Sequence, residues 1–200
     1  MAAPLDFYFD FSSPYGYFAA TKIDALAARY ERSVAWKPVL LGAVFKVTGG
    51  APLPTLPLKG EYAMRDIERS ARFHGIAYKR PSKFPIASQA PARAFYWLHE
   101  RDPQRAAELA LALYRAYFAD NLDISSPDVT ADVAASRGLN RDDVLAAIND
   151  AAVKDALRRE VDAAIARGVF GSPYIVVDGE PFWGFDRFDQ LERWLAQGPF

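Results

Sequence analysis

The feature that most constrains this chain is a short aromatic segment that leads directly into a helix start. Residues 5–11 (LDFYFDF) set aromatic side chains among short polar ones, a pattern typical of a buried strand. The strand stops at Ser12-Ser13-Pro14, where proline suits the first helical turn and the preceding serine suits the cap. A helix to about residue 31 and a second strand over 33–39 follow. This order is typical of two parallel strands joined by a right-handed crossover.

The middle of the chain is helical in pattern. A loop rich in proline and glycine, residues 49–57, separates it from the opening. Gly138 and Gly168 supply helix stops, while Asn140 and the pair Ser126-Pro127 supply starts. The helices are predicted at approximately 60–75, 87–101, 103–119, 127–137, 141–150 and 153–168.

The end of the chain returns to strands. Residues 174–177 and 181–184 flank Asp178-Gly179, which is a strong hairpin signal, and a final amphipathic helix is predicted from Asp186. The whole order predicts an α/β fold in which a small βαβ…ββα domain carries a large all-helical insertion. We expect the α/β domain to comprise residues 1–40 and 169–200, and the insertion residues 41–168.

Composition excludes several classes of chemistry. The 200 residues include no cysteine and two histidines, so a disulfide framework, a thiolate or histidine metal site and thiol redox cycling by the chain itself are all excluded. Lysine plus arginine (24) nearly balances aspartate plus glutamate (25), which offers no strong field for nucleic acid or membrane. We find no secretory signal and no apolar run long enough to span a bilayer, and therefore expect a soluble, cytoplasmic protein.

Ser13 is the first candidate for chemistry, because it lies where a strand's carboxyl end meets a helix start. Ligands bind at that edge of open α/β sheets, and a hydroxyl there can donate a hydrogen bond to a thiolate or an oxyanion. The alternative is that Ser13 simply caps its own helix, which local sequence favours. The two histidines stand far from it in sequence, and no Ser-His-Asp triad is readable.

Two further segments allow a functional and a structural interpretation. The bond between Ser172 and Pro173 would, if cis, leave the Ser172 backbone extended and free to pair with a peptide-like ligand; a trans proline opening an edge strand is the alternative. Asp186 either caps the final helix or, with the turn before it, meets a ligand carrying carboxylate and ammonium groups.

A basic face and several aromatics are the weakest candidates. Cationic side chains facing a cleft would attract an anionic substrate, although interspersed acids favour an ordinary solvated helix face. Aromatic side chains could line a pocket for an aromatic substrate, although core packing explains most aromatics. The residues concerned are Lys59, Arg65, Arg69, Arg72, Lys79, Arg80 and Lys83, with the aromatics Tyr15, Phe45, Tyr62 and Phe84.

Taken together, four segments in this order resemble the 2-hydroxychromene-2-carboxylate isomerases, relatives of kappa-class glutathione transferases within the DsbA-like thioredoxin superfamily. They are residues 7–15 (FYFDFSSPY), 40–46 (LLGAVFK), 169–173 (VFGSP) and 182–187 (FWGFDR). The resemblance implies a thioredoxin-like domain with a helical insertion, a homodimer, and glutathione bound between the two domains. It also implies reversible isomerisation of a small aromatic carboxylate in aromatic-compound catabolism, with glutathione as an unconsumed cofactor.

The resemblance also assigns roles to residues. Ser13 matches the catalytic serine that stands where redox relatives keep a cysteine, and its hydroxyl would stabilise the glutathione thiolate, as helix N-termini activate cysteine. Ser172, before the family's cis-proline, would pair with the cysteinyl unit of glutathione. Further glutathione-binding residues would be Trp183, Gly184, Phe185 and Asp186, and substrate-binding residues Phe45, Lys46 and Phe84.

Two departures from the family concern the substrate side. Residues 50–53 stand where some members carry an asparagine, and the substrate-loop lysine and tyrosine of characterised isomerases have Phe45 and Phe84 at the nearest places. Two alternatives therefore remain: a kappa-type glutathione transferase or peroxidase acting on another electrophile, and a binding module without activity.

Overall fold

A four-stranded mixed sheet with helices packed around it forms the centre of the computed structural model, which describes residues 3–200. The strands lie in the order β2-β1-β3-β4. β1 (Leu5–Phe9) pairs in parallel with β2 (Val34–Pro38) and antiparallel with β3 (Tyr174–Val177), which forms a hairpin with β4 (Glu180–Trp183). The predicted parallel pair and the predicted hairpin are both confirmed.

The crossover between β1 and β2 is two helices rather than one. α1 (Pro14–Ala20) ends at Thr21, and α2 (Ile23–Ala28) begins after Lys22. The Thr21 hydroxyl donates a 2.7 Å hydrogen bond to the Phe18 carbonyl at this break, a local side-chain bond of the kind that competes with helix continuation. The prediction of one continuous helix to about residue 31 is therefore wrong, because the chain forms two short helices here.

Between β2 and β3 the chain is mostly helical, as predicted. Two elements had no predicted counterpart: α3 (Leu41–Thr48), and a 3₁₀ turn, η1 (Leu53–Thr55), inside the loop rich in proline and glycine. The other helices start and end close to the predicted bounds. They are α4 (Lys59–His74), α5 (Gln89–His99), α6 (Pro103–Phe118), α7 (Pro127–Ser136), α8 (Arg141–Asn149) and α9 (Ala151–Ala166).

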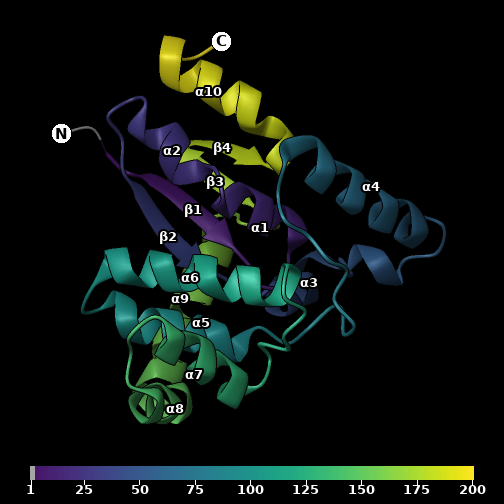
Figure 1. The fold of residues 1–200 in the computed structure, drawn as a ribbon. Coiled ribbons are helices and arrows are strands. Elements are labelled where there is room, and N and C mark those ends of the chain that lie inside the picture. The colour runs from purple at the N-terminus through teal and green to yellow at the C-terminus, as the bar shows by residue number, and fades with distance from the viewer. Residues whose placement is uncertain (1–2) are drawn as a thin grey trace.

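Helices α5 to α9 pack on one another and lie together below the sheet in Figure 1. At the opposite end, α10 (Phe188–Gln197) follows a 3₁₀ turn, η2 (Phe185–Arg187). The N-cap of α10 is Arg187, so the capping role considered for Asp186 is wrong. None of the helices described is long and apolar enough to cross a membrane. The division into two domains at residues 40 and 169 stays a prediction.

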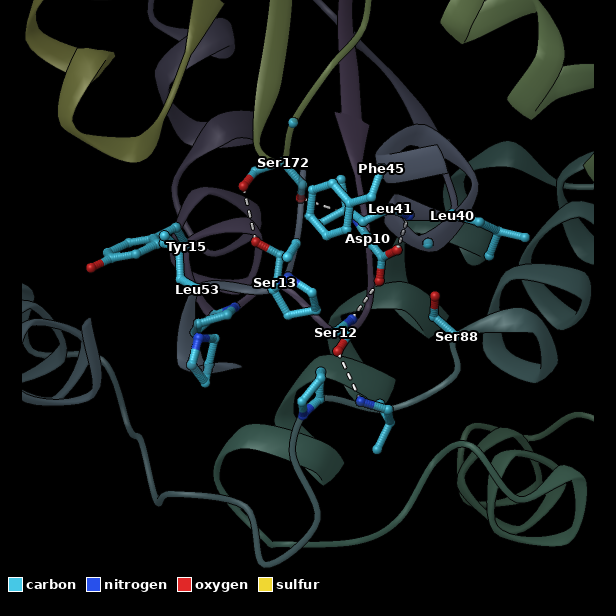
Figure 2. Close-up of a pocket in the computed structure, with 18 of the residues that line it drawn as sticks. Asp10, Ser12, Ser13, Tyr15, Leu40, Leu41, Phe45, Leu53, Ser88 and Ser172 are labelled. Carbon is cyan, nitrogen blue, oxygen red and sulfur yellow. Dashed lines mark hydrogen bonds between the residues drawn. The ribbon is translucent and has the colours of Figure 1, made fainter. Parts of the chain in front are cut away.

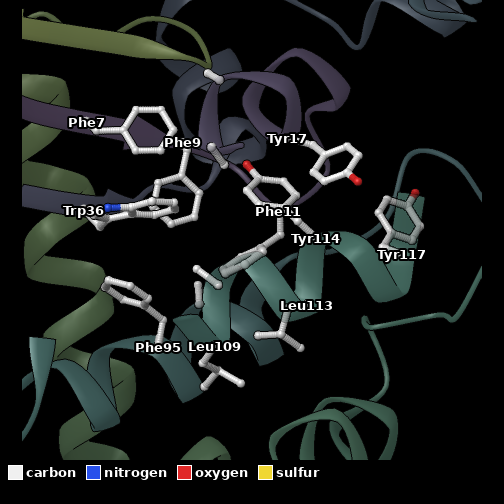
Figure 3. Packing of buried hydrophobic residues seen from close by; sticks show 14 of the residues in the cluster. Phe7, Phe9, Phe11, Tyr17, Trp36, Phe95, Leu109, Leu113, Tyr114 and Tyr117 are labelled. Atoms are coloured by element: carbon white, nitrogen blue, oxygen red, sulfur yellow. The ribbon is translucent and has the colours of Figure 1, made fainter. Parts of the chain in front are cut away.

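A large aromatic core joins the sheet to the helices. Phe9 on β1 makes edge contacts with Trp36 on β2 and with Phe95 on α5, at ring separations of 5.4 Å and 5.9 Å. Tyr114 on α6 lies 5.2 Å from Phe11, just beyond β1 (Figure 3). These rings bury large apolar areas on both sides of the junction, so the end of β1 is held firmly against α5 and α6.

Candidate active site

A cavity of about 780 Å³ opens where β1 ends. The turn after β1 forms its floor, and the loop before β3, the start of α3, η1 and the loop 84–89 surround it (Figure 2). Its walls are mainly apolar, and within residues 3–200 its charged lining residues are Asp10 and Lys46. An apolar cavity with a few converging polar groups is the usual form of a small-molecule site.

Ser13 lies at the centre of this floor, where its side chain makes two hydrogen bonds. Its Oγ accepts a 3.0 Å bond from the Gly16 amide, so Ser13 caps α1 as expected, and it donates a 3.0 Å bond to the Ser172 carbonyl oxygen. Ser13 is only 6% exposed, yet it lines the cavity. Ser13 is thus both a helix cap and a cavity hydroxyl, which sequence analysis had treated as alternatives.

The close approach of Ser13 and Ser172 depends on Gly16. A Cβ atom at position 16 would lie 2.7 Å from both the Ser172 Oγ and the Tyr114 hydroxyl oxygen. The Ser172 Oγ also accepts a 2.9 Å hydrogen bond from the Asp10 amide, and the Ser172–Pro173 peptide bond is cis. Chain segments about 160 residues apart in sequence therefore meet through one small residue.

Asp10 is the buried acid of the site, with 2% of its surface exposed. One carboxylate oxygen accepts a 2.7 Å hydrogen bond from the Ser12 amide, and the other accepts a 2.6 Å bond from the Leu41 amide (Figure 2). Burial raises the pKa of Asp10, while these two bonds and the nearby Ser88 hydroxyl act to lower it. The backbone oxygen of Asp10 accepts from the buried Tyr114 hydroxyl at 2.8 Å.

The predicted substrate residues also line the cavity. Phe45 and Lys46 line it from α3, and Phe84 lines it from the loop after α4. Tyr15 also lines the cavity and donates its hydroxyl to Asp66 of α4, which joins α1 to α4. The structure therefore brings all three predicted substrate residues to the same cavity as Ser13.

The predicted glutathione residues before and after the hairpin of β3 and β4 divide into two groups. Ser172 and Trp183 line the cavity, and Trp183 packs edge-on against Phe170 at a ring separation of 4.9 Å. Residues 184–186 lie outside the set of described residues that line it. Phe185 is buried against Phe18, and the Asp186 carboxylate accepts a 2.9 Å bond from Arg187. Roles for these three in binding stay predictions.

The basic face and one of the aromatics lie away from the cavity lining described. Arg69 pairs with Asp66, and Lys83 pairs with Asp123 at 2.8 Å, which fits the solvated-face interpretation. Tyr62 on α4 is exposed. The sequence analysis did not predict several other lining residues. The one feature that could have indicated them is Asp10, a charged residue within an aromatic strand pattern. The missed residues include Asp10, Leu41 and Ser88.

The chain is similar to known proteins over nearly its whole length. Residues 4–196 match the model of the DsbA-like thioredoxin domain family. Over 198 residues, 98% of this chain and 99% of the relative, it is 29% identical to a 2-hydroxychromene-2-carboxylate isomerase from Sphingobium xenophagum. It is also 29% identical to glutathione S-transferase kappa 2 from Caenorhabditis elegans, over 97% and 92% of the two chains.

A solved structure of a 2-hydroxychromene-2-carboxylate isomerase superposes with a TM-score of 0.87 at 27% identity, covering 96% of this chain and 94% of the other. The predicted resemblance and the predicted fold class are therefore confirmed.

Proposed function

Because this chain belongs to the DsbA-like thioredoxin domain family and resembles isomerases over nearly its whole length, we propose that it is a glutathione-dependent isomerase. It would interconvert 2-hydroxychromene-2-carboxylate and trans-o-hydroxybenzylidenepyruvate. The observation that carries the proposal is Ser13: a cavity hydroxyl at a helix start, in a chain that contains no cysteine. A site shaped for thiol chemistry but lacking its own thiol fits a thiol brought by a cofactor.

The residues present fit glutathione. The cavity volume of about 780 Å³ lies within the range of roughly 300–1,000 Å³ typical of ligand sites. The Ser13 hydroxyl needs only to turn from the Ser172 carbonyl to donate to a sulfur in the cavity. Ser172, just before β3, would hold the cysteinyl unit through its backbone, and Trp183 would form the wall beside the γ-glutamyl end.

When bound, glutathione would supply a thiol nucleophile for the conjugated substrate and would not be consumed. Ser13 would favour the thiolate over the thiol, because a hydrogen bond to a charged acceptor is stronger than one to a neutral acceptor. Lys46 would attract the carboxylate of the substrate, as the cationic side chain of the described cavity lining. Phe45 and Phe84 would contact its aromatic ring.

The decisive test is calorimetric titration of reduced glutathione into the wild type, Ser13→Ala and Ser126→Ala, with ultraviolet detection of the thiolate. Ser126 is the matched control, because its side chain also caps a helix, α7, but lies away from the described cavity lining. Both substitutions remove a cap and cost about 1 kcal/mol of stability. Only Ser13→Ala should raise the pKa of the bound thiol, by about one unit or more.

Turnover assays then separate the two enzymatic possibilities. Isomerisation without loss of glutathione supports the proposal, whereas steady consumption of glutathione with an electrophile would favour a kappa-type transferase, to which the chain is equally similar. Absence of binding to the wild type at millimolar glutathione would refute the cofactor assignment. Unchanged turnover in Ser13→Ala would refute the role of the serine.

A further inference from the structure

Asp10 connects the two sides of the cavity through a single carboxylate. One oxygen holds the Ser12 amide, in the turn that carries Ser13, at 2.7 Å, and the other holds the Leu41 amide, at the start of α3, at 2.6 Å. These segments are separated by about 30 residues and by β2. A side chain this deeply buried is retained as an acid only where its hydrogen bonds offset the cost of burying it.

The α3 end of this connection depends on Asp10 more than the Ser13 end does. The N-cap of α3 is Leu40, whose side chain has no acceptor, so the Asp10 carboxylate takes the place of a cap from a distant part of the chain. Ser13 has additional support from the Gly16 amide and the Ser172 carbonyl. Helix α3 in turn carries Phe45 and Lys46 into the cavity.

We infer that Asp10 is a positioning residue that sets the place of α3, and with it Phe45 and Lys46, relative to the Ser13 hydroxyl. The inference rests on the proposed function, since Phe45 and Lys46 face the substrate in that reaction. Both carboxylate oxygens accept backbone hydrogen bonds, so the side chain acts on the site through the two segments that it holds.

The first test is Asp10→Asn, whose single carbonyl oxygen can accept from one of the two amides while its NH₂ group cannot accept from the other. Helix α3 is the more weakly held partner, so we expect the KM for the chromene substrate to rise by about three- to tenfold, the ratio that one lost hydrogen bond corresponds to. The Kd of glutathione should stay within about twofold of the wild type. Asp24→Asn is the control, because Asp24 accepts a hydrogen bond from Trp36 outside the described cavity lining and should leave both constants unchanged.

The second test removes the donor instead of the acceptor. Leu41 is the first residue of α3, where proline is accepted, and Leu40 has an extended backbone (φ −110°, ψ 101°) that suits the position before proline. Leu41→Pro deletes the amide that Asp10 holds, while Leu41→Ala shortens the side chain and keeps that amide. The KM of Leu41→Pro should exceed that of Leu41→Ala by about the same three- to tenfold. Comparing these two variants tests the positioning role of Asp10 even if Asp10→Asn does not fold.

Three results would overturn the inference. An unchanged KM in Asp10→Asn, with glutathione bound normally, would refute it and leave the proposed function intact. Loss of one limb of the pH profile of kcat/KM in Asp10→Asn would instead make Asp10 a proton-transfer group. Failure of the wild type to bind glutathione would refute the proposed function itself, and the positioning role with it.

Discussion

The two sides of the cavity are built differently. On the Ser13 side, α1 packs against α6, and Ser13, Gly16 and Tyr114 are buried. The Gly16 amide donates to the Ser13 Oγ, and the Tyr114 hydroxyl donates to the Asp10 carbonyl. On the other side, α3 buries Val44 but leaves Val47 exposed, and the loop towards α4 includes Leu58, which is 93% exposed. The first side is part of the protein core, whereas the second lies over the cavity with much of its apolar surface in solvent.

This difference separates two requirements of the proposed reaction. A hydroxyl that stabilises a thiolate must be held in a fixed direction, which dense packing and hydrogen bonds achieve. A surface that contacts both the ring-closed and the ring-opened form of the substrate is better placed on a segment that can adjust, and segments with few buried contacts open most easily. The Ser13 side is therefore expected to tolerate little change, and the α3 side considerably more.

The sharpest test of this contrast makes one substitution, glycine to alanine, on each side. In Gly16→Ala the new Cβ would lie 2.7 Å from two buried oxygen atoms, so we expect a loss of stability of about 1–3 kcal/mol or more, together with weaker glutathione binding. In Gly42→Ala, within α3, the new Cβ meets no described atom within 4 Å, and alanine should stabilise the helix by about 0.5–1 kcal/mol. Urea unfolding measures both, and equal effects would contradict the contrast.

A smaller difference is expected between two tyrosine hydroxyls. Tyr114→Phe removes the 2.8 Å bond to the Asp10 carbonyl in the core, which should cost about 1–2 kcal/mol, since water cannot replace it there. Tyr15→Phe removes the bond to Asp66, which keeps its pairing with Arg69 near the surface, and should cost less than about 1 kcal/mol. Chemical denaturation of the two variants in parallel tests the order, and a larger effect in Tyr15→Phe would contradict the view that the Ser13 side is held more firmly in the core, at α6, than at its edge with α4.

The same contrast explains how much could be predicted from sequence. The Ser13 side follows local rules: an aromatic strand, a capping serine and a proline at the helix start predicted β1, the start of α1 and the Ser13 cap. Local rules also located the hairpin after Ser172 and most helices between the strands. These signals lie within a few residues of the structure that they specify.

Helix α3 was missed because its cap is supplied from another part of the chain. Leu40 carries no capping side chain, and the acceptor that replaces it, Asp10, stands about 30 residues earlier. The role of Asp10 could not be predicted for the same reason, since in the sequence it is only one polar residue in an aromatic segment. Asp186 illustrates the opposite error, a local signal that the structure does not use. The 3₁₀ turn η2 precedes α10 and places Arg187, not Asp186, at its N-cap.

The smallest effect is expected from pH, because burial and hydrogen bonding act on the Asp10 carboxyl in opposite directions. The net result is a raised pKa, so the folded protein keeps a proton that the unfolded chain releases above about pH 4. The contribution of Asp10 to the free energy of unfolding must then decrease as pH rises from there through the folded-state pKa. Subtracting the unfolding free energy of Asp10→Asn from that of the wild type at each pH isolates this contribution, since the similarly raised pKa of Asp24 affects both proteins. A difference that grows with pH would mean that the hydrogen bonds from the Ser12 and Leu41 amides lower the pKa of Asp10 more than burial raises it. The carboxylate would then join the two sides of the cavity more firmly than the contrast between them implies.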